Sequence, residues 1–147
     1  MSGTSLAGRR DLLAVVLDAL VPAGDGFPGA GTVALDHVLG AAAASPETDR
    51  LLSGGLEAIE AAARGADLAA LDAGAREALL RSVEEAQPAL FEALVRHAYE
   101  GYYSHADVVT RLGLDPRAPQ PHGHRIEWRE EPDVSRVIAR GRIYRQA

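Results

Sequence analysis

Histidine is the side chain in this sequence most suited to metal chemistry, because the chain contains no cysteine. Imidazole binds zinc, copper, iron and nickel. None of the histidines is paired at the i, i+4 spacing that puts two imidazoles on one face of a helix. His97 and His105 are eight residues apart and would align only if a helix continued through Gly101. We therefore predict no metal ligands, and a His-dependent metalloprotein is the least favoured interpretation. The histidines are His37, His97, His105, His122 and His124.

Nucleophilic and acid–base chemistry has equally little support. No Gly-x-Ser-x-Gly elbow is present, and Ser104 and His105 are merely adjacent in sequence. Neighbouring carboxylates such as Glu84 and Glu85 point apart on a helix. The glycine-rich stretch 24–31 precedes a helix start, where free amides could hold an anion. It matches neither a Walker loop nor a dinucleotide fingerprint, so a structural turn is predicted. The sequence predicts no catalytic residue and no cofactor bound by this chain.

Aromatic residues are concentrated in the last third of the chain, and most of them are tyrosines. Tyr, Trp and Arg are enriched among the residues that dominate binding energy at protein interfaces. A tail this irregular could contact a partner or pack back on its own helices, and the sequence leaves both open. The residues predicted to contact a partner are Tyr102, Tyr103, Arg125, Trp128, Arg142 and Tyr144.

The elements that must position these residues are helices. Apolar residues make up 47% of the 147 residues and aromatics only 5%, which favours a closely packed Leu, Val and Ala core. Helical spacing predicts a first helix over about 5–21 and a second, capped by Thr32, that reaches about Ala44. Ser45, Asp72 and Pro88 mark the starts of three more helices. A short helix over about 106–112 ends at Gly113.

The chain changes character after Leu114. Three prolines between Asp115 and Arg125 exclude an ordinary helix or a central strand, so an extended segment is expected. The sequence thus predicts an all-α fold: a single compact bundle of about five to six helices with an extended Pro-rich, Arg-rich C-terminal tail. We assign 1–114 to the helical domain and 115–147 to the tail, with a possible short helix near 133–140.

Charge and hydropathy exclude some partners. The net charge is −6, and residues 1–114 carry eight Arg against sixteen acids. Nucleic-acid binding needs a concentrated positive face, so it is not expected. The longest apolar stretch, Leu12 to Val21, is about half of a membrane span, so direct membrane insertion is not expected either. Arg9-Arg10 could suggest a twin-arginine export signal, but Asp11 and Asp18 interrupt the apolar segment that such a signal requires. We expect a domain helix that begins with two solvated arginines.

Several short motifs occur in an order that resembles one family. They are Leu17-Asp-Ala-Leu-Val-Pro22, then Phe27-Pro-Gly-Ala30, then Phe91-Glu-Ala-Leu94, and finally Tyr99-Glu-Gly-Tyr-Tyr-Ser104. Over about residues 10–114 the chain resembles the subunit 3 family of gluconate 2-dehydrogenase. The tail motifs Pro119-Gln-Pro-His-Gly123 and Arg140-Gly-Arg-Ile-Tyr144 are similar to those of a subgroup.

This resemblance implies a small accessory subunit of a large FAD-dependent oxidoreductase of the glucose-methanol-choline type. The large subunit would hold the flavin and oxidise a sugar, sugar acid or alcohol, and the small one would support its folding, stability or export. Some members carry a twin-arginine signal, whereas here Arg9-Arg10 runs straight into the first helix. We therefore expect a cytoplasmic complex, periplasmic only if carried with an exported partner. Ser104-His105-Ala106 replaces an Asp-Pro step of many relatives, so that position receives no role.

A self-associating helical scaffold is the alternative interpretation. A neighbouring coding region for a flavin oxidoreductase would favour the accessory subunit, self-association of the purified chain would favour the scaffold, and stoichiometric metal would favour a metalloprotein.

Substitution of Trp128 distinguishes an interface tail from a core tail. We expect Trp128→Ala to weaken binding to the partner while the helicity of the isolated chain stays nearly intact, because Trp128 is an isolated tryptophan in an irregular segment. Pull-down and circular dichroism measure the two effects. Melting of the isolated domain would show that the tail is part of the core.

Overall fold

The computed structural model describes residues 6–117 and 133–141. The chain divides into two units, Met1–Arg117 and Ala118–Ala147. Arg125, Trp128, Arg142 and Tyr144, predicted to contact a partner, lie outside the described residues.

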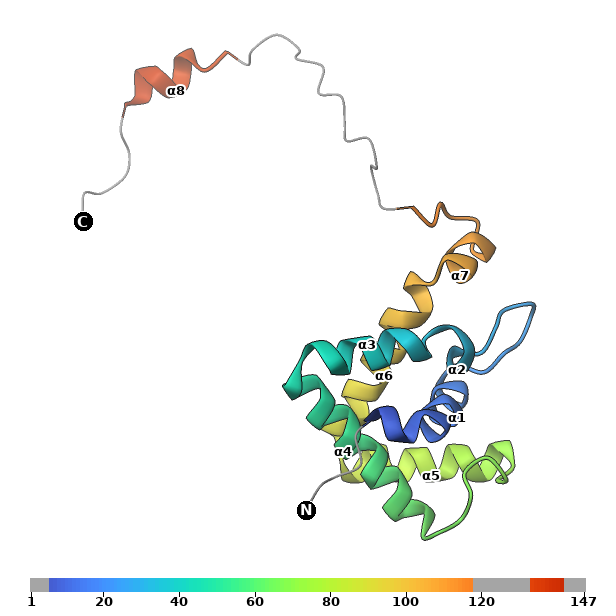
Figure 1. Ribbon diagram of the computed structural model, residues 1–147. Coiled ribbons are helices and arrows are strands. Elements are labelled where there is room, and N and C mark those ends of the chain that lie inside the picture. Colours follow the sequence, from blue (N-terminus) through green and yellow to red (C-terminus); the bar gives the residue numbers. More distant parts are fainter. Residues whose placement is uncertain (1–5, 118–132, 142–147) are drawn as a thin grey trace, which may run out of the picture. The chain divides into compact units, whose positions relative to one another are not determined.

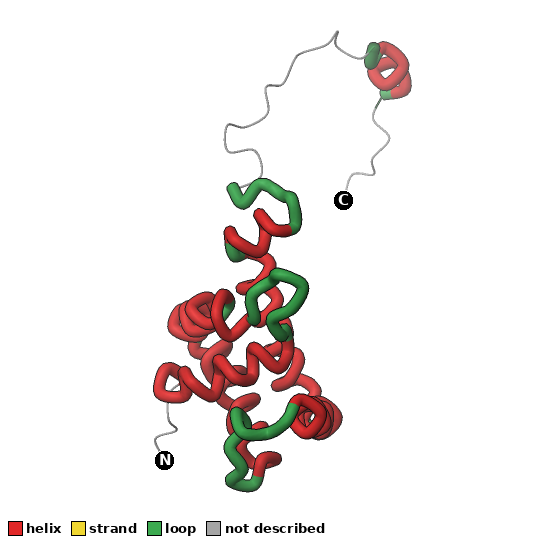
Figure 2. Tube along the Cα trace, turned by 90° about the vertical axis from the view of Figure 1, so that its right-hand side faces the viewer, coloured by secondary structure: helices red, strands yellow, loops and turns green. Residues whose placement is uncertain are grey.

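The predicted all-α class is confirmed. In the described ranges, eight α-helices and one 3-10 helix are present, and an isolated bridge between Gly24 and Phe27 is the nearest approach to a strand (Figure 2). None of these helices is long and apolar enough to cross a membrane. The elements are the 3-10 helix Leu6–Arg9 and the helices α1 (Arg10–Leu20), α2 (Ala30–Val33), α3 (Leu35–Ala44), α4 (Pro46–Ala63), α5 (Ala73–Ala86), α6 (Pro88–Ser104), α7 (Ala106–Arg111) and α8 (Ser135–Arg140).

Local capping explains where the longer helices begin. The Ser45 hydroxyl accepts a hydrogen bond from the Thr48 amide at 3.2 Å, and the Asp72 carboxylate accepts one from the Ala75 amide at 2.8 Å. These bonds satisfy amides that have no partner within the helix. Pro88 occupies the first turn of α6, where its missing N–H costs nothing. All three predicted helix starts are confirmed.

The prediction of one helix from Thr32 to about Ala44 is wrong in its starting residue, and the segment forms two helices instead of one. Its first turn is the separate helix α2, which begins at Ala30, and α3 follows after Ala34. Thr32 lies inside α2 and caps nothing. The Gly31 amide in the first turn of α2 donates instead to the side chain of Asp18 on α1, and spacing along the sequence does not reveal a partner so remote.

Helix α6 lies at the centre of the Met1–Arg117 unit. It packs against each of the other helices, α1 to α5 and α7, and Figure 1 shows it running behind α3 and α4 toward α7. Its inward face includes Phe91, Leu94, Ala98 and Tyr102, all buried. The rest of the core is built mainly from Leu, Val and Ala, as the composition predicts.

Gly55 allows α4 and α6 to approach closely. A Cβ atom at this position would lie 2.7 Å from Leu94 Cδ1 and 3.3 Å from the Leu90 carbonyl oxygen. Leu94 is fully buried, so its side chain has little room to move aside. At neighbouring Gly54 an added Cβ would meet the Leu90 methyls at 3.4 Å, an ordinary contact. Close approach of the two helices therefore depends on Gly55 rather than on Gly54.

Arg9 and Arg10 both belong to the folded domain. The Arg9 side chain is only 13% exposed, and its guanidinium lies 3.3 Å from Glu57 Oε1 and 3.7 Å from Glu60 Oε2 on α4. Arg10 pairs with Asp36 on α3 at 2.7 Å. The expectation of two solvated arginines is wrong for Arg9, because the folded chain brings acidic residues of α4 to it.

Of the second unit, the structure describes only α8 and the residues beside it. The Asp133 carboxylate accepts a hydrogen bond from the Ser135 amide at 3.0 Å, and bonding to Ser135 lowers the pKa of this carboxyl. No residue of α8 is buried.

The two adjacent glycines of α4 provide a matched pair of substitutions. We expect Gly55→Ala to lower the free energy of unfolding by about 1 kcal/mol, because overpacking of about 1–3 kcal/mol exceeds the gain in helix propensity of about 1 kcal/mol. Gly54→Ala should instead raise it by up to about 1 kcal/mol. Chemical denaturation measures both. Equal effects of the two would contradict the close approach at Gly55.

Candidate partner-binding surface

The loop between α1 and α2 is fastened at its end by Asp18. The Asp18 carboxylate on α1 accepts a hydrogen bond from the Gly31 amide at 2.8 Å, at the start of α2. A Cβ atom on Gly31 would lie 2.6 Å from the other carboxylate oxygen, so a glycine is needed here. The helix start considered as an anion site is thus filled by the chain's own carboxylate, and the prediction of a structural turn agrees with this arrangement.

Two side chains from the C-terminal half hold the same loop. The Tyr102 hydroxyl donates to the Pro28 carbonyl at 3.0 Å, and the Arg111 guanidinium donates to the Gly26 carbonyl at 2.6 Å. Burial, with a smaller contribution from Tyr103, raises the pKa of the Tyr102 phenol, and the charge of Arg111 opposes this. Tyr102 therefore remains a neutral donor at neutral pH. The loop and the end of α6 form one connected structure.

The two adjacent tyrosines of α6, Tyr102 and Tyr103, differ in exposure: one is buried and the other exposed. Tyr102, one of the residues predicted to contact a partner, is only 4% exposed, so it offers little surface for such a contact. Tyr103 is 56% exposed. Its ring packs edge-on against Tyr102, with the ring centroids 5.2 Å apart. Tyr103 is thus an exposed aromatic side chain held by a buried and hydrogen-bonded neighbour.

Exposed large apolar side chains of the first unit are confined to one stretch of the chain. Within residues 6–117 they all lie between the second half of α6 and the segment just after α7. Tyr99 and Tyr103 are one helical turn apart, and their ring centroids are separated by 5.9 Å. We call these residues the α6–α7 apolar set: Tyr99, Tyr103, Leu112 and Leu114. Tyr103 is among the residues predicted to contact a partner and the other three are not, although the i, i+4 spacing of Tyr99 and Tyr103 is visible in the sequence.

Helix α8 carries a second group of exposed apolar side chains. Val134, Val137 and Ile138 follow i, i+3, i+4 spacing, which places them on one face, and they are 49%, 65% and 74% exposed. Arg136 and Arg140 share the helix. Within residues 133–141, exposed apolar side chains therefore lie beside basic ones on one short helix.

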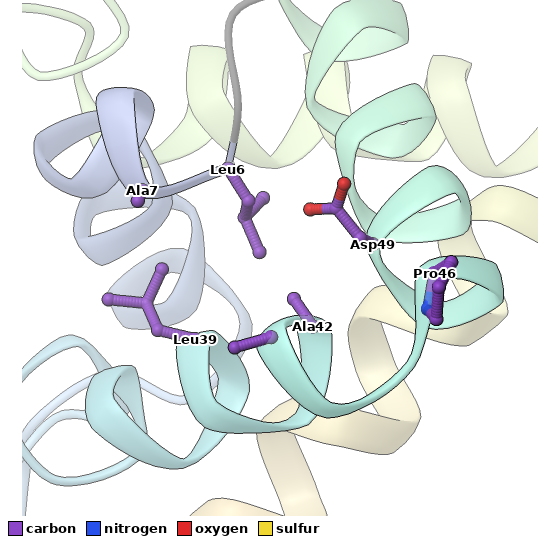
Figure 3. Close-up of a pocket in the computed structure, with 7 residues that line it drawn as sticks. Leu6, Ala7, Leu39, Ala42, Pro46 and Asp49 are labelled. Carbon is purple, nitrogen blue, oxygen red and sulfur yellow. The ribbon is translucent and has the colours of Figure 1, made fainter.

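A hollow beside the N-terminal 3-10 helix is lined mainly by apolar side chains. It has a volume of about 410 Å³ and lies between this helix, α3 and α4. Figure 3 shows Leu6, Leu39 and Ala42 around it, with the Asp49 carboxylate on the α4 side. Asp49 is the one ionisable side chain among its lining residues, so the hollow offers no acid–base pair.

One cluster in the described residues could hold a metal ion. His37 on α3 and His97 and Glu100 on α6 each place a possible ligand atom within 4.8 Å of the other two. This cluster is not visible as a spacing motif, because His37 is far in sequence from His97 and Glu100. Helix α6 does continue through Gly101, but His105, the residue tested as a partner for His97, does not belong to the cluster.

Within the described residues, the first unit is a small all-helical domain with exposed aromatic and aliphatic side chains at the end of α6 and after α7. The chain belongs to the gluconate 2-dehydrogenase subunit 3 family, whose model matches residues 7–114, and the resemblance seen in the motifs is confirmed. The name of the family describes a subunit of a gluconate dehydrogenase. No curated protein and no solved structure shows significant similarity to the chain.

Removal of the Asp18 carboxylate tests how the loop is held. We expect Asp18→Ala to lower the free energy of unfolding by about 1–2 kcal/mol, because the Gly31 amide at the start of α2 loses its acceptor. Asp36→Ala is the control. It removes an equally charged side chain whose exposed ion pair with Arg10 contributes at most about 1 kcal/mol. Thermal denaturation of both variants measures the difference, and equal loss would contradict the anchoring role of Asp18.

Proposed function

We propose that this chain is a non-catalytic small subunit that binds and stabilises a large FAD-dependent dehydrogenase of the glucose-methanol-choline type. The partner holds the FAD and oxidises a sugar, sugar acid or alcohol. Membership of a family of dehydrogenase subunits supports the association. The observation that supports the proposal on the chain itself is the α6–α7 apolar set, because it holds every exposed large apolar side chain within residues 6–117.

Tyr103 is the proposed anchor of this contact. Interface hot spots are enriched in tyrosine, and a side chain already fixed before binding loses little conformational entropy on association. Packing on Tyr102, whose hydroxyl is bonded to the Pro28 carbonyl, fixes Tyr103 in this way. Tyr99 widens the aromatic surface, and Leu112 and Leu114 add aliphatic area.

The second contact element is the C-terminal unit. Val137 and Ile138 on α8 gain from burial against a partner, and Arg136 and Arg140 can pair with its carboxylates. Arg125, Trp128, Arg142 and Tyr144 are proposed to act with α8 on the partner, since Trp and Arg favour interface centres. A permanent interface of this kind buries more than about 2,000 Å².

We place the complex in the cytoplasm. Arg9 and Arg10, which could have belonged to an export signal, are engaged with acidic residues of α4 and α3. Their ion pairs support a structural role within the domain. Fractionation of the host, followed by detection of the chain in the cytosolic or periplasmic extract, tests this placement.

The proposed complex is tested by purification from the native host. A tagged full-length chain should bring down a protein of several hundred residues, and the eluate should show flavin absorbance. A colourless chain that elutes alone as an oligomer would contradict the proposal and favour a self-associating scaffold. Expression of the flavoprotein with and without this chain then tests stabilisation, because a stabilising subunit should raise the yield of soluble, flavin-loaded partner.

Tyr103 provides a residue-level test of the same contact. We expect Tyr103→Ala to weaken partner binding by at least about tenfold, as loss of an aromatic hot spot does. The isolated chain should lose little stability, because the exposed ring contributes an aromatic contact of about 0.5–1.5 kcal/mol. Arg81→Ala on α5 is the control: its side chain is 65% exposed and outside the apolar set, so binding should not change. Titration calorimetry with the purified partner measures both, and equal affinities would exclude Tyr103 as an anchor.

A further inference from the structure

The cluster of His37, His97 and Glu100 has the composition of a transition-metal site. His97 and Glu100 are three residues apart on α6, so they share a face of the helix. His37 reaches them from α3, and the possible ligand atoms of all three lie within 4.8 Å of one another. Two imidazoles and a carboxylate are the protein ligands of many zinc sites that keep a further position open.

The crossing of α3 and α6 determines where His37 lies. A Cβ atom on Gly101 would be 3.0 Å from the Cβ atoms of both Ala34 and His37. The backbone of α6 at Gly101 therefore touches the first atom of the His37 side chain. This contact holds the Cβ atom of His37 beside the part of α6 that carries Glu100. Packing of the two helices therefore brings His37 to the cluster before any ion binds.

His97 supplies a second and independent observation. Its Nδ1 atom is buried and forms no hydrogen bond. Glu100 Oε2 lies 2.8 Å from it, close enough for an ion pair, although the geometry is not that of a hydrogen bond. An imidazole lone pair and a carboxylate lone pair repel at this distance unless a hydrogen on Nδ1 or a metal ion lies between them. Because Nδ1 forms no hydrogen bond, a metal ion is a partner that would satisfy both atoms.

The distances fit a metal ion with one adjustment. Zinc–nitrogen and zinc–oxygen bonds of about 2.0–2.2 Å place two ligand atoms of one ion roughly 3 Å apart, close to the His97–Glu100 separation. The possible ligand atom of His37 lies within 4.8 Å of the other two, and a rotation of its side chain can bring it to the separation that one ion requires. His37 is exposed and its ring is free to rotate toward the other two.

We propose that His37, His97 and Glu100 bind a divalent first-row transition ion, with Zn²⁺ as its representative. Imidazole with carboxylate suits zinc and also accepts cobalt and nickel. His37 and Glu100 face solvent, so water completes the coordination. The bound ion joins α3 to α6 at their crossing and stabilises the folded domain by mass action. This site is independent of the proposed flavoprotein partner.

Binding is tested on the full-length chain after removal of any histidine tag. We expect calorimetric titration with Zn²⁺ to give one ion per chain, and Co²⁺ to give visible absorption bands from bound imidazole and carboxylate. His97→Gln and Glu100→Gln should each weaken Zn²⁺ binding by about tenfold or more, because each removes a ligand. Excess Zn²⁺ should raise the Tm of the native chain and leave that of His97→Gln unchanged.

Two control variants separate this site from the remaining histidines. His105→Gln removes a histidine beside the end of α6 that does not belong to the cluster, so Zn²⁺ binding should persist. His122→Gln with His124→Gln removes the other two histidines of the sequence and should also leave binding intact. Absence of Zn²⁺ binding by the native chain would overturn the proposal. Binding that survives His97→Gln but is lost with His122→Gln and His124→Gln would overturn it as well. Circular dichroism of Glu100→Gln, an exposed isosteric change, shows that lost binding is not lost folding.

Discussion

Close packing of α6 against its neighbours is the constraint on which the rest of the first unit depends. A helix can lie against several others only if the backbones are allowed to approach, and small residues at the crossings make this possible. Gly55 brings α4 onto Leu94, and Gly101 brings α3 onto α6 beside Ala34. Larger residues at either crossing would push a helix outward and open space around a core that contains few aromatic residues to fill it.

The same helix connects the core to the surface. Tyr102 extends the buried face of α6 and bonds to the Pro28 carbonyl, while Tyr103, the next residue, is exposed and packs on it. Asp18 holds the other end of the loop through the Gly31 amide. A rigid interior thus supports an exposed aromatic side chain, which is the arrangement that favours binding with little loss of entropy. The chain belongs to a family of dehydrogenase subunits.

Much of the fold could be predicted because its signals are local. Ser45 and Asp72 cap helices within three residues of themselves, and Pro88 begins α6, so composition and short spacing were sufficient. The start of α2 was predicted wrongly because its acceptor, Asp18, is thirteen residues away. Arg9 was expected in solvent for the same reason, since its partners Glu57 and Glu60 lie on a distant helix.

The sequence by itself determined the helical class, most helix starts, the family and the concentration of tyrosines near the end of α6. These properties depend on residue type and on spacings of a few residues, which a linear pattern contains. Only the tertiary structure decided which of Tyr102 and Tyr103 is buried and which is exposed. It also decided that His37 meets His97 and Glu100. The first outcome depends on the loop before α2, whose Pro28 carbonyl accepts the Tyr102 hydroxyl, and the second on how α3 and α6 cross. Both are fixed by the packing of segments that are far apart in the sequence.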